Sequence, residues 1–212
     1  MTPPADHYFT ADPESRSQRR SLDVELAGHP MTVSTQSGVF SADRVDPGTA
    51  VLLRAVPLPP DNGHLLDLGC GWGPLALTMA MRAPTATVWG VDVNPRAVAL
   101  LRDNAAALGL SGIRAAESGD IPTGLSFGAI WSNPPIRIGK SALHELLLAW
   151  LPRLAAEADG YLVVQRHLGA DSLHSWLSAT LGSGFEVTRL ASSKGYRVLR
   201  VHRWAEADLE PA

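Results

Sequence analysis

Between residues 64 and 181, short apolar runs alternate with longer stretches in which apolar positions recur every three or four residues. The short runs predict buried strands, and the recurring positions predict helices with one buried face. We expect strands at residues 64–68, 87–92, 113–117, 127–132 and 161–165. We expect helices at residues 74–82, 95–108, 141–156 and 170–181. This alternation predicts an α/β fold, in which helices cover both faces of a mainly parallel sheet.

The pattern changes at both ends of this region. Residues 185–190 and 196–204 are two strand-like runs joined by five residues without a helix between them. So short a connection requires antiparallel pairing, because parallel strands need a longer crossover. Near the N-terminus, the alternation of residues 22–35 around Gly28 predicts a β-hairpin. The expected sheet is therefore seven-stranded and mostly parallel, with an antiparallel last hairpin and a separate N-terminal β-hairpin.

Length and composition predict one main domain. The chain has 212 residues, of which 45% are hydrophobic and 18% are charged, as in ordinary globular proteins. We expect a polar N-terminal arm at residues 1–20, interpreted as a solvated tether, and a hairpin appendage at residues 21–45. The main domain should occupy residues 46–206 and a short tail residues 207–212.

Charge, histidine and cysteine usage narrow the possible functions. No apolar run is long enough to span a bilayer and no signal peptide precedes the domain, so we expect a cytoplasmic protein. A single cysteine, Cys70, and seven histidines without metal-ligand spacing predict neither a disulfide nor a bound metal. The net charge of −3 argues against binding nucleic acid by bulk electrostatics, although a local basic face stays open.

A glycine-rich turn follows the first strand of the main domain. Asp67 lies in that strand, and Gly69, Gly71 and Gly73 follow it. Glycines let the backbone approach a ligand, and the next helix offers N–H groups at its N-terminus. A dinucleotide-binding site requires a different glycine spacing, with a glycine for helix packing at the position where this chain has Pro74. In addition, the carboxylate of Asp67 would repel a pyrophosphate. The turn favours the methionyl part of S-adenosylmethionine, with Asp67 binding its ammonium directly or through water.

Two further carboxylates follow the next strands. Asp92 lies 19 residues after Gly73, where a carboxylate can accept both hydroxyls of a ribose. The alternative for Asp92 is that it only caps the next helix. Asp120 follows residues 113–117 and is expected to accept the amino group of adenine, with a turn-forming role equally open.

The segment Asn133-Pro134-Pro135 comes directly after the fourth expected strand. Two prolines stiffen the chain, so the Asn133 side chain and the Pro134 carbonyl are presented rigidly. Both oxygens can accept hydrogens from a substrate –NH2 and aim its lone pair at a sulfonium methyl. Asn-Pro turns are common in structural roles, but the position of this one favours methyl transfer to nitrogen.

These segments resemble class I S-adenosylmethionine-dependent methyltransferases, and specifically the small methyltransferase domain family, which includes ribosomal RNA small-subunit methyltransferase C. The likeness rests on residues 67–73 and 133–135 and on the upstream segments 37–41 and 46–49, and it covers roughly residues 22–204. The antiparallel last hairpin is also how a methyltransferase sheet ends. The resemblance implies a Rossmann-like methyltransferase fold, S-adenosylmethionine as cofactor and a planar nitrogen as methyl acceptor.

The resemblance also implies roles by position. It assigns Asp67, Gly69, Gly71 and Gly73 to the methionyl site, Asp92 to the ribose, and Asn133, Pro134 and Pro135 to the methyl acceptor. Ile136 completes this catalytic motif but departs from the family pattern, because many members carry an aromatic side chain that stacks on a base. Stacking would then require another residue, such as Phe40, Trp72 or Tyr196. Substrate capture is expected from the hairpin and from loops bearing Arg137, Lys140 and Lys194.

The leading hypothesis is an RNA methyltransferase that acts on an exocyclic amine, guanine N2 in ribosomal RNA, with the base exposed or flipped. The nearest alternative is an N-methyltransferase of a protein glutamine or a small molecule, because an amide –NH2 fits the same acceptors. A non-catalytic S-adenosylmethionine-binding protein and an NAD-dependent oxidoreductase are less favoured. The oligomeric state stays open.

Overall fold

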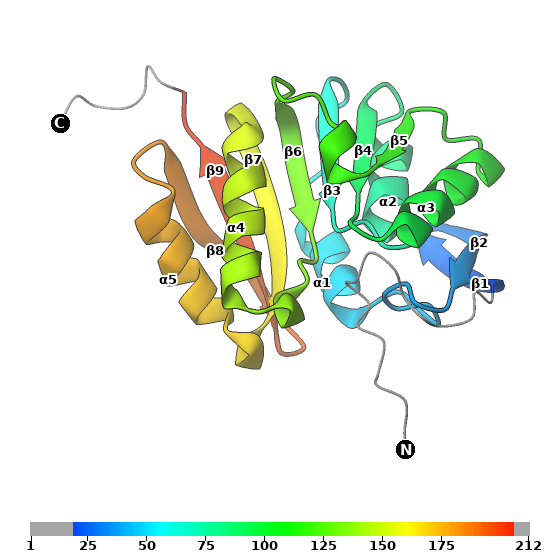
Figure 1. The fold of residues 1–212 in the computed structure, drawn as a ribbon, viewed down its shortest axis with the longest axis horizontal. Coiled ribbons are helices and arrows are strands. Elements are labelled where there is room, and N and C mark those ends of the chain that lie inside the picture. Colours follow the sequence, from blue (N-terminus) through cyan, green and yellow to red (C-terminus); the bar gives the residue numbers. More distant parts are fainter. Residues whose placement is uncertain (1–18, 206–212) are drawn as a thin grey trace.

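A seven-stranded sheet forms the centre of the computed structural model, which describes residues 19–205 (Figure 1). Its strands lie in the order β5-β4-β3-β6-β7-β9-β8. Strand β9 pairs antiparallel with both β7 and β8, and the other strands run parallel to one another. The strands are β3 (His64–Leu68), β4 (Thr87–Val91), β5 (Ile113–Ala116), β6 (Phe127–Ser132), β7 (Leu154–Gln165), β8 (Phe185–Ser193) and β9 (Tyr196–Arg203). The predicted α/β class with an antiparallel last hairpin is confirmed.

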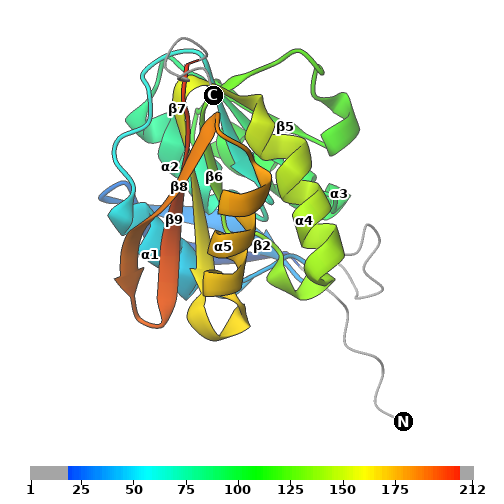
Figure 2. The same ribbon diagram turned by 90° about the vertical axis from the view of Figure 1, so that its left-hand side faces the viewer.

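Helices cover both faces of the sheet, as Figure 2 shows for α1 and α2 on one side and α4 and α5 on the other. The helices are α1 (Pro47–Ala55), α2 (Pro74–Arg82), α3 (Pro95–Ala107), α4 (Lys140–Trp150) and α5 (Ala170–Thr180). Successive residues of a strand belong to the hydrophobic cores on opposite faces of the sheet: Leu65 packs with α1, α2 and α3, whereas Leu66 packs with α4 and α5. This alternation explains why the central strands are apolar at nearly every position.

The N-terminal hairpin consists of β1 (Arg19–Leu26) and β2 (His29–Gln36). It is joined to α3 through Asn104, whose Nδ2 donates to the Ser34 carbonyl at 3.0 Å and whose Oδ1 accepts the Ser34 N–H at 2.7 Å. The hairpin therefore lies against the helix that follows β4. Residues 1–18 of the expected arm and the expected tail lie outside the described residues, while Arg19 and Arg20 begin β1.

Several elements differ from the expectation. Helix α1 was not predicted; it begins at Pro47, and its N-cap Asp46 accepts the Thr49 N–H at 3.0 Å. Helix α4 ends at Trp150 rather than at residue 156, because Pro152 interrupts the helix. Strand β7 begins at Leu154, which pairs with Phe127, rather than at residue 161. The last hairpin turns at two residues, not five, since residues 191–193 stay paired in β8. Both turn residues, Lys194 and Gly195, have positive φ, as a two-residue hairpin turn requires.

Of the helices between residues 19 and 205, none combines the length and the apolar character needed to cross a membrane.

Candidate active site

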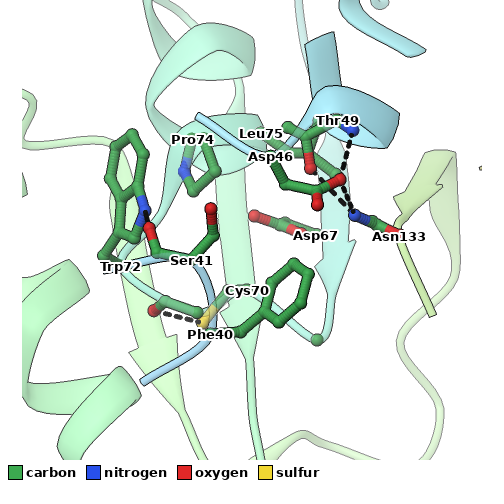
Figure 3. Close-up of a pocket in the computed structure, with 12 residues that line it drawn as sticks. Phe40, Ser41, Asp46, Thr49, Asp67, Cys70, Trp72, Pro74, Leu75 and Asn133 are labelled. Carbon is green, nitrogen blue, oxygen red and sulfur yellow. Dashed lines mark hydrogen bonds between the residues drawn. The ribbon is translucent and has the colours of Figure 1, made fainter. Parts of the chain in front are cut away.

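A pocket lies at the carboxyl ends of β3 and β6, the edge of a parallel sheet where ligands bind in many α/β proteins (Figure 3). Three segments line it: the chain around the start of α1, the glycine-rich turn after β3, and the end of β6. The residues are Phe40, Ser41, Asp46, Thr49, Asp67, Gly69, Cys70, Gly71, Trp72, Pro74, Leu75 and Asn133. The structure thus brings the expected methionyl site and the expected acceptor residue Asn133 together.

Two of the three glycines in the turn leave open space for a ligand. Gly69 and Gly71 have φ of 79° and 55°, and a Cβ there would come no closer than 4.0 Å and 3.9 Å to any other part of the protein. Gly73 is different, because a Cβ at that residue would lie 2.4 Å from Leu101 Cδ1. Gly73 does not line the pocket, and it must be glycine for its φ of 104° and for packing α2 against α3. Its expected contact with a cofactor stays a prediction.

Asp67 presents one unpartnered carboxylate oxygen at the pocket. The side chain is completely buried, and its Oδ2 accepts the Ala76 N–H at 2.9 Å. Within the described residues, Oδ1 has no hydrogen-bond partner. Burial raises the pKa of Asp67 to about 8, and the hydrogen bond from Ala76 opposes this shift only in part. A cationic group at Oδ1 would restore the charged form, which is what the expected role toward an ammonium requires.

Asp92 holds the glycine turn in place. Its Oδ2 accepts the Gly71 N–H and its Oδ1 accepts the Asn94 N–H, both at 2.9 Å. Helix capping falls to Asn94, whose side chain accepts the Arg96 N–H, so Asp92 is not the cap of α3. The Val93 N–H also interacts with this carboxylate, and Asp92 does not line the pocket around Asn133. The ribose contact remains a prediction, as does the adenine contact of Asp120, which is exposed in a short turn outside the pocket.

Asn133 is fixed by two acceptors from the start of α1 (Figure 3). Its Nδ2 donates to Asp46 Oδ2 at 2.8 Å and to Thr49 Oγ1 at 3.0 Å. No described residue donates to its Oδ1, which is therefore available to a substrate. Just before it, the Ser132 hydroxyl donates to the Leu68 carbonyl at 2.6 Å and ties the end of β6 to the end of β3.

The Pro134 carbonyl is partly occupied. It accepts the Ile136 N–H at 2.8 Å, and its second lone pair is left for a substrate. Pro135 Cδ lies 4.0 Å from where a Cβ of Gly69 would be, so the acceptor motif adjoins the glycine turn. The two expected parts of the reaction site are therefore neighbours.

Ile136 and the basic residues lie beyond the pocket. Ile136 is half-buried and lines a second hollow between α4 and α5, together with Lys140 and His144. Arg137, Lys140 and Lys194 are exposed, and none of them lines the pocket around Asn133. Their role in substrate capture stays a prediction.

The structure corrects one of the three aromatic candidates for base stacking. Trp72 is 1% exposed, and its Nε1 donates to the Ser41 carbonyl at 3.1 Å, so its ring is part of the core. Phe40 lines the pocket, and Tyr196 lies half-buried beside Gly48. Phe40 and Tyr196 are less deeply buried than Trp72, and a stacking role for either ring stays a prediction.

Asp46 and Thr49 are functional candidates to which sequence reasoning gave no role. Both line the pocket and both accept hydrogen bonds from Asn133. The available signal was the dipeptide Asp46-Pro47, since Asp at the N-cap followed by Pro at the first helical position predicts a helix start. Within residues 19–205, no group of three His, Cys, Asp or Glu side chains could hold a metal ion.

A model of the methyltransferase small domain matches residues 30–200. The uncharacterized protein YbxB of Bacillus subtilis (strain 168) is 30% identical over 202 residues, which cover 94% of this chain and 99% of YbxB. The ribosomal RNA small subunit methyltransferase C of Pseudomonas putida (strain GB-1) is 44% identical over 130 residues, which cover 59% of this chain. The matched part is only 37% of that enzyme, so the likeness concerns one portion of a longer protein.

Solved methyltransferase structures also resemble this chain. The 16S rRNA N2 G1207 methyltransferase RsmC of T. thermophilus, solved in complex with AdoMet and guanosine, is similar with a TM-score of 0.75 and 27% identity. The match covers 89% of this chain and 51% of that chain. A methyltransferase from Pyrococcus furiosus matches with a TM-score of 0.56 and 20% identity over 73% of this chain and 80% of its own, a likeness of fold alone.

Proposed function

Because this chain belongs to the methyltransferase small domain family, we propose that it transfers a methyl group from S-adenosylmethionine to the exocyclic amine of a guanine in ribosomal RNA. The chain is an S-adenosylmethionine-dependent methyltransferase, as the family and its structural relatives indicate. The proposal adds the acceptor. It is supported by the Thermus relative, which is named for the N2 atom of a guanine in 16S rRNA.

The residues of the pocket fit the methyl donor. Asp67 Oδ1 is a buried acceptor that no other described residue contacts through a hydrogen bond, and the methionyl ammonium is a cation that would satisfy it. The open space in front of Gly69 and Gly71 gives room for the donor to lie against the backbone. Asp92 fixes this backbone, and we assign the ribose to the accepting capacity that its carboxylate keeps beside its backbone hydrogen bonds.

The free Oδ1 of Asn133 is the observation that carries the proposal. An –NH2 group can donate one hydrogen to this oxygen and the other to the free lone pair of Pro134 O. Two such bonds turn the nitrogen lone pair toward the glycine turn, which adjoins the motif at Pro135. The catalytic contribution of these residues is the alignment of the nitrogen, not the removal of a proton before attack.

When bound, S-adenosylmethionine would supply an electrophilic methyl group and would leave as the neutral thioether, while Asn133 and Pro134 hold the nitrogen that gains the methyl group and loses one proton to water. As positive charge develops on the nitrogen, its hydrogens become better donors. Their bonds to Asn133 and Pro134 therefore strengthen toward the transition state, which is the condition for catalysis.

The test is transfer of labelled methyl groups to separated RNA, protein and small-molecule fractions, with native chain and an Asn133→Ala variant. We expect label in ribosomal RNA, at a guanine, and a loss of at least about a hundredfold in the variant. The affinity of the variant for S-adenosylmethionine should stay within about tenfold of the native value. RNA with inosine at the labelled position is the matched substrate control, because inosine lacks the exocyclic amine and should receive no label.

Label found only in protein would contradict the RNA acceptor and favour a second candidate, methylation of a glutamine amide. One feature of the chain supports that candidate. Ile136 stands where many family members carry an aromatic residue, and an amide acceptor does not need a stacking partner. Full activity of Asn133→Ala would contradict the mechanism for either acceptor.

A further inference from the structure

The amide of Asn133 can serve its proposed role in only one of its two orientations. With Oδ1 toward the substrate, the amide accepts from the –NH2; with Nδ2 toward the substrate, two donors would meet. Asp46 and Thr49 contact the other end of this amide, at 2.8 Å and 3.0 Å. We propose that Asp46, assisted by Thr49, is a positioning residue that holds Asn133 Oδ1 toward the methyl acceptor. This inference rests on the proposed function, because it concerns the same Asn133.

Asp46 is the contact that selects the orientation. An ionised carboxylate only accepts hydrogen bonds, so the atom that faces it must be Nδ2. A reversed amide would place Oδ1 about 3 Å from Asp46 Oδ2, with two acceptors facing each other and no hydrogen between them. Thr49 cannot select alone, because its hydroxyl can donate as well as accept. Thr49 does add a second point of contact, and its side chain is buried at 3% exposure.

The charge of Asp46 has a second effect. A hydrogen bond to an ionised group is stronger than one between neutral groups, and linked hydrogen bonds polarise one another. The bond from Asn133 Nδ2 to the carboxylate draws electron density toward Asn133 Oδ1. That oxygen then becomes a better acceptor for an amine hydrogen whose nitrogen is gaining positive charge. Asp46 therefore acts on the reacting nitrogen through Asn133 without touching it.

The start of α1 is built to keep this carboxylate in place. Asp46 is the N-cap of α1, and the same Oδ2 that binds Asn133 also accepts the Thr49 N–H at 3.0 Å. Pro47 fixes the backbone at the first helical position. Gly48 makes room, because a Cβ at that residue would lie 2.9 Å from both Asp46 Oδ2 and Tyr196 Cε1. The capping role and the positioning role thus use one oxygen, and an experiment must separate them.

Two substitutions of Asp46 achieve this separation. Asp46→Ser keeps an N-cap acceptor for Thr49, since serine caps helices as well as aspartate does, but its side chain is too short to reach Asn133. Asp46→Asn keeps an oxygen at the position of Oδ2, removes the charge and places an –NH2 group at Oδ1, which takes part in neither hydrogen bond. The matched control is Asp43→Ser, which removes an exposed carboxylate three residues away that pairs with Arg20.

We expect kcat to fall about a hundredfold in Asp46→Ser, on the substrate that the native chain labels, with little change in KM for S-adenosylmethionine. Asp46→Asn should restore activity to within about tenfold of the native value, and Thr49→Val should cost less than about tenfold. Melting temperature and donor affinity should match those of Asp43→Ser in all of these variants. This split between kcat and donor affinity is a result that a purely structural role would not produce.

Two results would overturn the inference. One is a kcat for Asp46→Ser equal to that of Asp43→Ser. The other is a fall in kcat that is as large in Asp46→Asn, or that comes with an equal fall in melting temperature and in affinity for S-adenosylmethionine. Failure of the proposed function looks different, because the native chain would then label no RNA or would not depend on Asn133. If the native chain labels protein instead, the same variants measured on that protein test the role of Asp46 in the same way.

Discussion

The two sides of the candidate site are built in different ways. On the side of the glycine turn, Asp67 and Trp72 are fully buried, Asp92 is half-buried, and all three are bonded to backbone groups. On the opposite side, beyond Asn133, the cationic side chains are exposed, and within the described part of the chain they form no ion pair. These are Arg137, Lys140 and Lys194. We call the side of the glycine turn the methyl-donor side and the side beyond Asn133 the methyl-acceptor side. The donor side is preformed by the fold, whereas the charged side chains of the acceptor side can still rearrange around a substrate.

The largest effect should come from Asp67 on the donor side. Its pKa is about 8 in the native structure and near 3.8, the ordinary value of an aspartate, in the unfolded chain. Between these values the native state binds the proton and the unfolded state does not, so the free energy of unfolding falls as pH rises. Asp67→Asn removes this contribution and keeps an oxygen for the Ala76 N–H. The slopes of unfolding free energy against pH should differ by up to about 1.4 kcal/mol per pH unit between about pH 4 and 8.

Urea unfolding of both proteins across this pH range measures the difference. The same substitution should weaken binding of S-adenosylmethionine, because a neutral amide replaces the carboxylate that faces the ammonium. Parallel slopes for the two proteins would mean that Asp67 is ionised in the native state and that the donor side holds a permanent charge.

A pair of glycine substitutions tests the rigidity of the two sides. Gly73 and Gly169 have nearly the same left-handed backbone, with φ and ψ of 104° and 22° at Gly73 and of 97° and 25° at Gly169, so alanine strains the backbone similarly at both residues. At Gly73 a Cβ would also lie 2.4 Å from Leu101, whereas at Gly169, which lines the second hollow with Ile136, it meets nothing within 4 Å. We expect Gly73→Ala to cost about 3 kcal/mol and Gly169→Ala about 1 kcal/mol in unfolding free energy. Equal losses in chemical denaturation would show that α2 and α3 can move apart and that the donor side is not rigid.

The smallest effect on stability should come from the acceptor-side charges. Exchanging Arg137, Lys140 and Lys194 together for glutamine should leave the unfolding free energy within about 0.5 kcal/mol, because all three are exposed and make no ion pair with another described residue. RNA binding should weaken, and each lost phosphate contact should lower the salt dependence of log K by about 0.7 for single-stranded RNA. Titrations at several salt concentrations measure this slope. An unchanged slope would remove these residues from the RNA contact and leave the acceptor side to Phe40 and the hairpin.

The same division explains which features were predictable from the sequence. The glycine turn and its strand are a local pattern, so the bounds of β3 and α2 agree with the expectation. The approach of Asn133 to Asp46 joins residues 87 positions apart, and no local pattern encodes such a contact. The orientation of the Asn133 amide therefore required the structure.

Two errors in the expected helices have local causes. Helix α1 has only nine residues, too few for a strong apolar period, and the capping signal at Asp46 was the better guide. Helix α4 was predicted to be too long because the residues after Trp150 are largely apolar. There, pairing of Leu154 with Phe127 in the sheet outweighs helix propensity. In both places a residue with a specific backbone role, Pro47 or Pro152, marked the boundary.

The position of β9 has a consequence for biosynthesis. This strand is the last one of the described residues, yet it lies between β7 and β8 and pairs with both. During synthesis, residues 196–203 are the last of these strands to leave the ribosomal exit tunnel. Until they do, β7 has an unpaired edge and β8 has no neighbouring strand. Such edges are templates for pairing with other chains. Synthesis of this protein therefore passes through an interval in which its sheet is incomplete at an interior position, and that is when shielding by a chaperone would matter most.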